Sequence, residues 1–303
     1  MIITVTLNPA IDQTVYIDNF QINEVNRIKS IRKDIGGKGI NVSQNLNNLK
    51  KDNLCVSILA GLNGRFIKDA LVHQGFNFKM FEVDGEVRIN LKAVDLKNNT
   101  FTDINEPGFE LSEEESQNII RSIVELAKPD DILVLSGSVP KGFQSNVYQE
   151  IIENVECKTI LDTSGELFVK GLEAKPYLIK PNIHELEELL NVEKISSEKE
   201  IVTSAKKLIE NGVEIVVVSL GAQGSIYVTQ DKTHKIEGKK VDVKSTVGAG
   251  DSMVAALAIA LDENYTIENM AKFASAVSTA SIMSEGSQPG DIKIIEELMN
   301  NGG

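Results

Sequence analysis

The chain has 303 residues, of which 42% are hydrophobic and 25% are charged, a composition typical of a globular protein. Its formal net charge of −13 argues against nucleic acid or an anionic membrane as a partner, because their phosphates require an excess of Lys and Arg. The longest apolar runs also fall far short of the ~20 residues that span a bilayer.

The N-terminal segment MIITVTLNP has no basic residue before its apolar stretch, which favours a strand over 2–8 rather than a signal peptide. Cys55 and Cys157 each lie in or beside an apolar, strand-like run. Two cysteines and three scattered histidines do not suit a disulfide framework or a metal site. We expect both thiols to be buried and reduced, as in the cytoplasm.

Short β-rich runs alternate with helical patterns along most of the chain. The amphipathic segment 111–128 places Ile119, Ile120 and Ile123 on one face, and its acidic start suits the N-terminal end of a helix. Apolar strands without strict alternation, separated by helices, predict a parallel sheet covered on both faces. The predicted strands are 2–8, 56–61, 131–137, 158–164, 177–182 and 214–220.

Two regions break this rhythm. Residues 15–20 and 27–35, and then 87–95 and 100–106, alternate apolar and polar side chains with no helix between them. The break NNT at 98–100 indicates a hairpin. These regions predict a small antiparallel sheet with one solvated face, which is a candidate lid and a candidate oligomer surface.

The glycine-rich turn GGKGINV (36–42) opens a predicted helix over 39–50. It is not a Walker A loop, because Lys38 is followed by glycine, and it is not a dinucleotide motif, because Val42 replaces the third glycine. Asn41, in the first helical turn, is a candidate contact for a sugar hydroxyl. The alternative is a turn that serves only to start the helix.

Two further turns follow predicted strands. In KPNxxE, Asn182 and Glu185 either form a capping box or hold Mg²⁺ through water. Turn SLGAQG (219–224) lies at the carboxyl end of a strand, where open α/β sheets bind ligands, although a plain β-turn has the same sequence.

The turn GAGD (248–251) precedes an apolar helix over 251–262. Its glycines let a ligand approach the backbone, and the amides at a helix start form an anion site. Asp251 is a candidate base, and we expect the helix N-terminus to keep it ionised and therefore weakly basic. The alternative is an N-cap aspartate. Arg88, the one charged residue of VRINL, is a candidate cation or an ordinary surface residue.

Together and in this order, these segments resemble the ribokinase-like (PfkB) carbohydrate kinases over essentially the full length of the chain. GGKGINVS resembles the N-terminal family signature, and STVGAGDSMVAAL resembles the C-terminal one. TLNPAIDQTV, LSGSVPKG, DTSGE, IKPNxxE and VVSLGAQG are similar to segments of the branch that phosphorylates ketohexose phosphates. Within it, VRINLK, DINEPG and LDTSGE most resemble 1-phosphofructokinases.

The resemblance implies ATP-dependent phosphorylation of fructose 1-phosphate at O6, which gives fructose 1,6-bisphosphate, with Mg²⁺ as the metal. It implies a three-layer α/β/α core with a mostly parallel sheet and a small antiparallel β lid. The whole chain, 1–303, would form one kinase domain with its lid at about 12–35 and 87–106. The lid would also pair two copies into a homodimer.

The resemblance further implies a role for each matching residue. Asp251 would activate the acceptor hydroxyl, and the amides of Gly248, Ala249 and Gly250 would stabilise the transferring phosphoryl group. ATP and Mg²⁺ would meet Lys180, Asn182, Glu185 (through water), Ser219, Gly221 and Gly224. The sugar would contact Asp12, Gly37, Lys38, Asn41 and Ser136, and its phosphate would contact Arg88, Lys38 and Arg27.

Other activities remain open on the sequence. Tagatose-6-phosphate kinase and 6-phosphofructokinase belong to the same family, and few residues of one pocket decide between such substrates. A non-catalytic regulator that binds sugar or nucleotide is an alternative of another class, although the intact Asp251 and its anion turn argue against it. A Rossmann dehydrogenase is disfavoured because the glycine motifs lack their third glycine.

Overall fold

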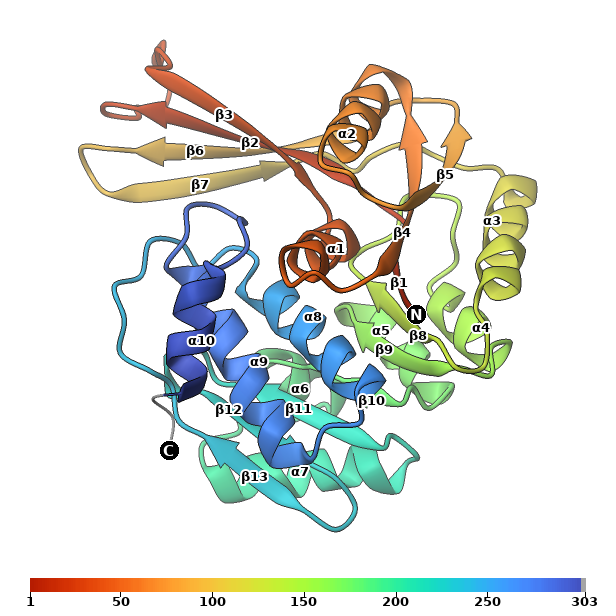
Figure 1. The fold of residues 1–303 in the computed structure, drawn as a ribbon. Coiled ribbons are helices and arrows are strands. Elements are labelled where there is room, and N and C mark those ends of the chain that lie inside the picture. Colours follow the sequence, from red (N-terminus) through yellow and green to blue (C-terminus); the bar gives the residue numbers. More distant parts are fainter. Residues whose placement is uncertain (301–303) are drawn as a thin grey trace.

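The computed structural model describes residues 1–300. Its larger sheet has nine strands in the order β13-β12-β11-β10-β9-β8-β1-β4-β5 (Figure 1). The pairs from β11 to β5 are parallel, and β12 and β13 form an antiparallel edge. The strands are β1 (Ile2–Thr6), β4 (Asn53–Ala60), β5 (Phe78–Val83), β8 (Ile132–Ser136), β9 (Lys158–Asp162), β10 (Leu178–Ile179), β11 (Ile215–Ser219), β12 (Ser225–Val228) and β13 (Thr233–Ile236).

Helices cover both faces of this sheet, so the core has three layers (Figure 1). One apolar core lies mainly under α2 (Gly61–His73), α3 (Glu113–Leu126), α4 (Val147–Glu153), α5 (Gly165–Glu173), α6 (Ile183–Leu189) and α7 (Glu198–Glu210). The other lies under α1 (Lys38–Asn48), α8 (Ala249–Asp262), α9 (Ile267–Ile282) and α10 (Ile292–Asn300). Helix α8 is apolar on nearly every side and is correspondingly buried from Asp251 to Leu261.

The predicted parallel sheet is confirmed. Each of the six predicted strands is present, although β10 is only two residues long, and the predicted helix 111–128 is α3. The Ser112 and Glu115 side chains close a capping box at its start. Both cysteines are buried free thiols. Among residues 1–300, no helix is long and apolar enough to cross a membrane.

The smaller sheet has four strands in the order β3-β2-β6-β7. The hairpin strands β2 (Ala10–Ile17) and β3 (Ser30–Gly36), and likewise β6 (Arg88–Asp95) and β7 (Thr100–Asn105), pair antiparallel as predicted. The central pair β2–β6 is parallel, which corrects the expectation of a wholly antiparallel sheet. Each hairpin leaves the core after one of its parallel strands, β1 or β5, so both hairpins start in the same direction.

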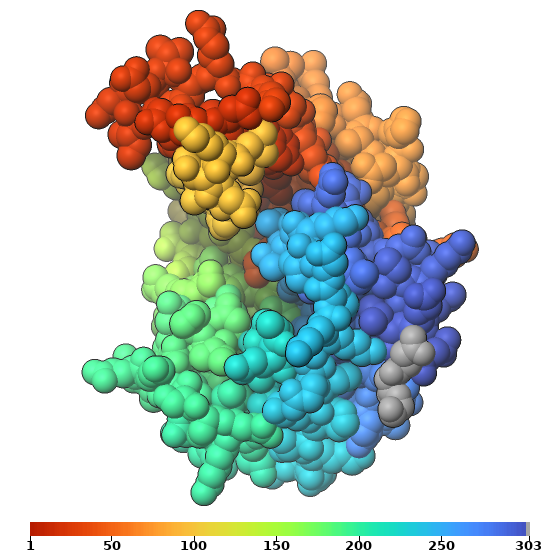
Figure 2. Space-filling view, turned by 90° about the vertical axis from the view of Figure 1, so that its left-hand side faces the viewer, coloured from red at the N-terminus to blue at the C-terminus, as the bar shows by residue number. Residues whose placement is uncertain are grey.

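The small sheet has one polar and one apolar face. Its polar face lines a cleft of about 820 Å³, whose other wall is formed by segments 243–247 and 285–287. The opposite face carries Val15, Ile17 and Ala93, with Ile31 and Ile104 each 54% exposed. Figure 2 shows the small sheet, in red and gold, projecting over the larger body. The face that was predicted to be solvated is therefore the polar face, which lines the cleft and lies toward the larger sheet.

Candidate active site

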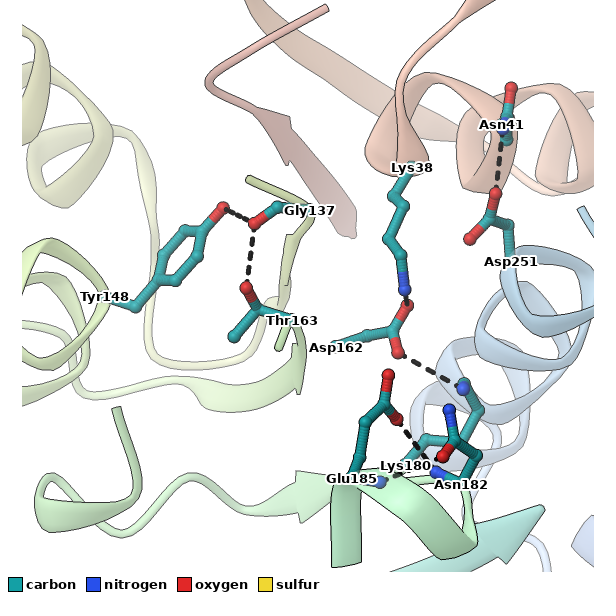
Figure 3. Close-up of polar contacts among 10 residues, drawn as sticks. All are labelled: Lys38, Asn41, Gly137, Tyr148, Asp162, Thr163, Lys180, Asn182, Glu185 and Asp251. Carbon is teal, nitrogen blue, oxygen red and sulfur yellow. Dashed lines mark hydrogen bonds and ion pairs between the residues drawn. The ribbon is translucent and has the colours of Figure 1, made fainter. Parts of the chain in front are cut away.

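The candidate residues converge at the carboxyl edge of the large sheet. Ser136 ends β8, Asp162 ends β9, Lys180 follows β10 and Ser219 ends β11. The first turns of α1 and α8 approach the same edge (Figure 3). Parallel strands bring their carboxyl ends together, so residues far apart in sequence meet there.

The GAGD turn forms the start of α8. Gly248 is the N-cap residue with φ +79°, and a side chain there would also press on Ser287, with an added Cβ 3.3 Å from its Cα. Asp251 is the third helical residue and caps no backbone amide, so the alternative of an N-cap aspartate is wrong. The amides of a first helical turn lack partners within the helix, and this turn therefore presents donors to an anion.

Asp251 is 6% exposed and accepts a 2.8 Å hydrogen bond from Asn41 Nδ2 (Figure 3). Burial raises the pKa of Asp251 to about 6, and the nearby Lys38 ammonium opposes this rise. The expectation that Asp251 is weakly basic is therefore wrong, because desolvation raises its pKa more than the helix N-terminus lowers it. At neutral pH Asp251 remains mainly ionised and is a stronger base than a solvated aspartate.

An ionic cluster centred on the buried Asp162 lies beside Asp251, and the Lys38 side chain of this cluster is 38% exposed. Asp162, with a fully buried side chain, contacts Lys38 Nζ at 3.0 Å through Oδ2 and Lys180 Nζ at 3.2 Å through Oδ1 (Figure 3). Burial alone would raise the pKa of Asp162, but the ammonium groups of Lys180 and Lys38 hold it below its usual range. Burial alone would lower the pKa of Lys38, but Asp162 and Asp251 hold it above its usual range.

The sequence analysis did not single out Asp162. The available signal was its position at the end of a predicted strand, in DTSGE, where the carboxyl edge of the sheet was expected. No sequence pattern links it to Lys38, which precedes it by 124 residues.

The capping-box alternative for KPNxxE is confirmed. Asn182 Oδ1 accepts from the Glu185 amide at 2.9 Å, and Glu185 Oε2 accepts from the Asn182 amide at 2.8 Å. The second Glu185 oxygen points toward Asp162 (Figure 3). Capping therefore leaves one carboxylate oxygen free to face the cluster.

The SLGAQG segment makes a tight turn between β11 and β12. Gly221–Gln223 form one 3₁₀ turn, and the Leu220 amide donates to Gly224 O at 2.8 Å. Gly224 has φ +96°, and an added Cβ would collide with the carbonyl of Ile236. Packing of the turn therefore requires Gly224, whereas Gly221 has open space around it and a φ of +56°.

On the small-sheet side, Asp12 lines the cleft, and Arg88 lies close enough to Asp12 for their charges to interact. Asp12 Oδ1 accepts a 2.9 Å hydrogen bond from Asn90, and burial raises the pKa of Asp12. A Cβ at Gly36 would collide with the Asp12 carboxylate, and Gly37 has φ +114°. Both glycines therefore keep α1 close to β2.

Arg88 donates to the Asn8 carbonyl at 3.2 Å, and its buried Nε has no hydrogen-bond partner within residues 1–300. No carboxylate of this described part lies within ion-pair distance of Arg88. Burial accordingly lowers the pKa of its guanidinium. A half-buried cation with an unused donor is suited to an anionic ligand.

Ser136 and Arg27, two further residues predicted to contact the sugar phosphate, lie in different environments. Ser136 is fully buried at the end of β8, in register with Asp162, and its hydroxyl has no partner among the described residues. Arg27 is exposed in the connection between β2 and β3, and within residues 1–300 no side-chain hydrogen bond or ion pair joins it to another candidate residue. One copy of the chain thus brings Ser136, but not Arg27, to the candidate site.

Comparisons with known proteins find similar sequences and structures over nearly the whole chain. The model of the pfkB family carbohydrate kinases matches residues 5–294. A 1-phosphofructokinase from Borreliella burgdorferi is 36% identical over 93% of this chain and 92% of its own. A tagatose-6-phosphate kinase from Staphylococcus epidermidis is 34% identical over 94% and 93%. The structure of phosphofructokinase-2 from Escherichia coli has a TM-score of 0.93 at 27% identity, covering 99% of this chain and 98% of that one.

Proposed function

The chain belongs to the pfkB family of carbohydrate kinases, and we propose that it transfers the γ-phosphoryl group of ATP to O6 of fructose 1-phosphate. The products are fructose 1,6-bisphosphate and ADP. The observation that carries this proposal is the half-buried Arg88, a cation with an unpartnered Nε on the acceptor side of the site. Relatives of 33–36% identity over nearly the whole chain that are 1-phosphofructokinases support the choice of sugar.

Arg88 would bind the phosphate that the sugar already carries. The overall charge of −13 opposes an anionic substrate, so a local cation must supply the attraction. Lys38 would add a second positive charge, and Arg27 would add a third only by moving or by reaching the site of another copy. Asp12, Gly37, Asn41 and Ser136 would contact the sugar hydroxyls.

Asp251 would act as the base. As O6 attacks the γ-phosphorus, the bond between that phosphorus and the ADP oxygen breaks, and the O6 proton passes to Asp251. The amides of Gly248, Ala249 and Gly250 would stabilise the charge on the transferring group. The raised pKa of Asp251 suits this role, because a buried carboxylate accepts a proton more readily than a solvated one.

ATP would lie along Lys180, Asn182 and the 219–224 turn. Among residues 1–300, no three His, Cys, Asp or Glu side chains form a metal cluster. This donor set fits a Mg²⁺ ion that is bound mainly by nucleotide phosphates, with the free oxygen of Glu185 reaching it through water. When bound, the ion would neutralise negative charge on those phosphates.

The small sheet would serve as the lid of a single kinase domain over 1–303, of which 301–303 lie outside the described residues. Its polar face would close over the sugar, and its apolar face would pair two copies into a homodimer. The exposed Ile31 and Ile104 favour such pairing, because water-exposed apolar strands associate. Buried free thiols suit the cytoplasm, which is the location we propose.

The proposal is tested by steady-state ADP release with MgATP and three acceptors: fructose 1-phosphate, fructose 6-phosphate and tagatose 6-phosphate. We expect kcat/KM to favour fructose 1-phosphate by ~100-fold or more, near 3 kcal/mol of transition-state discrimination. Preference for tagatose 6-phosphate, supported by the relative of 34% identity, would replace the sugar but keep the chemistry. Binding of sugar phosphate and ATP without turnover would instead indicate a regulator.

A further inference from the structure

Asp162 occupies an unusual position for a carboxylate. Its side chain is fully buried at the end of β9, and each of its oxygens contacts a different lysine. Burying an ionised carboxylate is costly unless its charge is matched. Lys38 and Lys180 supply that match, and both ammonium groups also act on the nearby Asp251, so Asp162 ties the two lysines to the part of the site that holds the proposed base.

The two lysines come from opposite sides of the site. Lys38 begins α1, on the acceptor side, and its stem packs against Gly137. Lys180 follows β10, on the nucleotide side, and an added Cβ at Gly250 would lie 3.5 Å from its Nζ. The Lys180 ammonium therefore stands beside the turn that is proposed to bind the transferring phosphoryl group.

We propose that Asp162 is a positioning residue that holds the Lys38 and Lys180 ammonium groups on the two sides of the transferring phosphoryl group. It acts through these lysines and not by contact with either substrate. This inference rests on the proposed function, because it places the phosphoryl group between the GAGD turn and the acceptor. Without Asp162, two like charges at close range would separate, and their positions would no longer match the charge that develops during transfer.

Asp162 also influences Asp251 through its charge. The groups around Asp251 are Lys38 and Asn41 from α1, Asp162 from β9 and Lys180 after β10, while Glu185 from α6 acts on Lys38. The faces of β1, β8 and α9 that pack near α8 carry apolar or hydroxyl side chains. Among these groups the Asp162 carboxylate raises the pKa of Asp251, whereas Lys38 and Lys180 lower it.

The test compares Asp162→Asn with Asp162→Glu, which restores the charge, and with Thr163→Val. Thr163 is the next residue, is also buried, and bonds only the Gly137 carbonyl, so its variant disturbs packing without removing charge. Each is assayed with the sugar phosphate that the wild type turns over fastest. An inactive wild type would overturn the proposed function, whereas an active one leaves this inference to be judged on the variants.

We expect Asp162→Asn to lower kcat by about 100-fold and to change KM for either substrate by less than about fivefold. The acid limb of its kcat/KM profile should move to lower pH, because one cause of the raised Asp251 pKa is gone. Asp162→Glu should return the limb toward the wild-type position, and Thr163→Val should leave it in place. The inference would be overturned by an acid limb that stays at the wild-type pH in Asp162→Asn. It would also be overturned by a limb that moves as far in Asp162→Glu as in Asp162→Asn.

Asp162→Asn leaves Lys180, whose side chain is 6% exposed, without its buried partner, and the variant is expected to be less stable. A second comparison removes this difficulty. The double variant Asp162→Asn/Lys38→Met is charge-balanced, and it is compared with Lys38→Met alone. If Asp162 acts through the lysines, its replacement costs much less kcat in the Lys38→Met background than in the wild type. Equal losses in both backgrounds would overturn the inference.

Discussion

Asn41 and Asp251, which lie 210 residues apart, are joined by a 2.8 Å hydrogen bond from Asn41 Nδ2 to Asp251 Oδ2. The bond links the first turn of α1 to the first turn of α8 and fixes one carboxylate oxygen of the proposed base. The other polar atom of this amide, Asn41 Oδ1, is buried and has no partner within residues 1–300. Under the proposed function, Asn41 would orient the base with its amino group and would offer its oxygen to a sugar hydroxyl.

Asn41→Ala tests this bond. The hydrogen bond from Asn41 lowers the pKa of Asp251. Loss of this bond should raise that pKa above about 6 and move the acid limb of the kcat/KM profile to higher pH. Activity falls as pH drops through this limb because the base must be ionised. We expect kcat/KM at neutral pH to fall about tenfold. Asn45→Ala is the matched control, since Asn45 bonds only the α1 backbone, and an identical pH profile for both variants would contradict the assignment.

Asp251→Asn should lower kcat by about 10³-fold while ATP and sugar phosphate still bind. The same change should stabilise the fold at high pH. In the wild type the pKa of Asp251 is about 6, above the ordinary value of 3.8, because the folded protein favours the protonated carboxyl. The protonated carboxyl therefore contributes to the free energy of unfolding below pH 4, and this contribution is lost as the pH rises through 6. We expect thermal denaturation of the variant at pH 8 to show a Tm about 5 °C higher, with little difference at pH 4.

Asp262→Asn, at the other end of α8, is the matched control for this experiment. It removes a carboxylate paired with Lys51 at the surface and should leave kcat unchanged. A near-normal kcat in Asp251→Asn would show that Asp251 is not the base.

Arg88→Ala should raise KM for the sugar phosphate by about 100-fold and KM for ATP by less than about threefold. The physical reason is that a charge-assisted contact to phosphate is lost on the acceptor side only. Steady-state kinetics with each substrate varied in turn measures both constants. Arg65→Ala, which removes an exposed arginine from α2, should change neither. Equal effects of Arg88→Ala on the two substrates would identify Arg88 as a structural residue.

Ile31→Asp should convert the proposed homodimer to a monomer. Ile31 is 54% exposed on the face of β3 opposite Arg32 and Asp34, which line the cleft. A charge there would have to be desolvated on pairing. Light scattering after size-exclusion chromatography measures the mass, with Leu62→Asp, an exposed apolar position on α2, as the control. A wild-type monomer, or a dimer that tolerates Ile31→Asp, would refute pairing through this face.

The layers of the fold could be predicted from the sequence because they depend on local patterns. Apolar runs identified six strands of the large sheet, and the amphipathic pattern of 111–128 with its acidic start identified α3. Strands β5, β12 and β13 of the large sheet were not predicted, because β5 and β13 are half-exposed and β12 and β13 have only four residues each. The parallel pairing of β2 with β6 was also missed, since it depends on where both hairpins leave the core and not on their own residues.

The candidate site could be predicted only in part, for a similar reason. Glycine turns and Asp251 carry local signals, whereas the partnership of Asp162 with two lysines exists only after folding. The pKa of Asp251 was predicted in the wrong direction because its burial is a tertiary property. A sequence shows that Asp251 begins a helix, but not that the start of α1 covers it.

The two hairpins of the small sheet have a further consequence, for the evolution of this chain. Asp12 and Arg88 lie on hairpins that leave the core after β1 and β5, whereas Asp251 and the rest of the GAGD turn belong to the core itself. Under the proposed function, substitutions of Asp12 or Arg88 would alter which sugar phosphate is accepted and would leave the packing around Asp251 in place. The proposed roles thus allow one part of substrate choice, the contacts of Asp12 and Arg88, to diverge while the chemistry of the core is inherited.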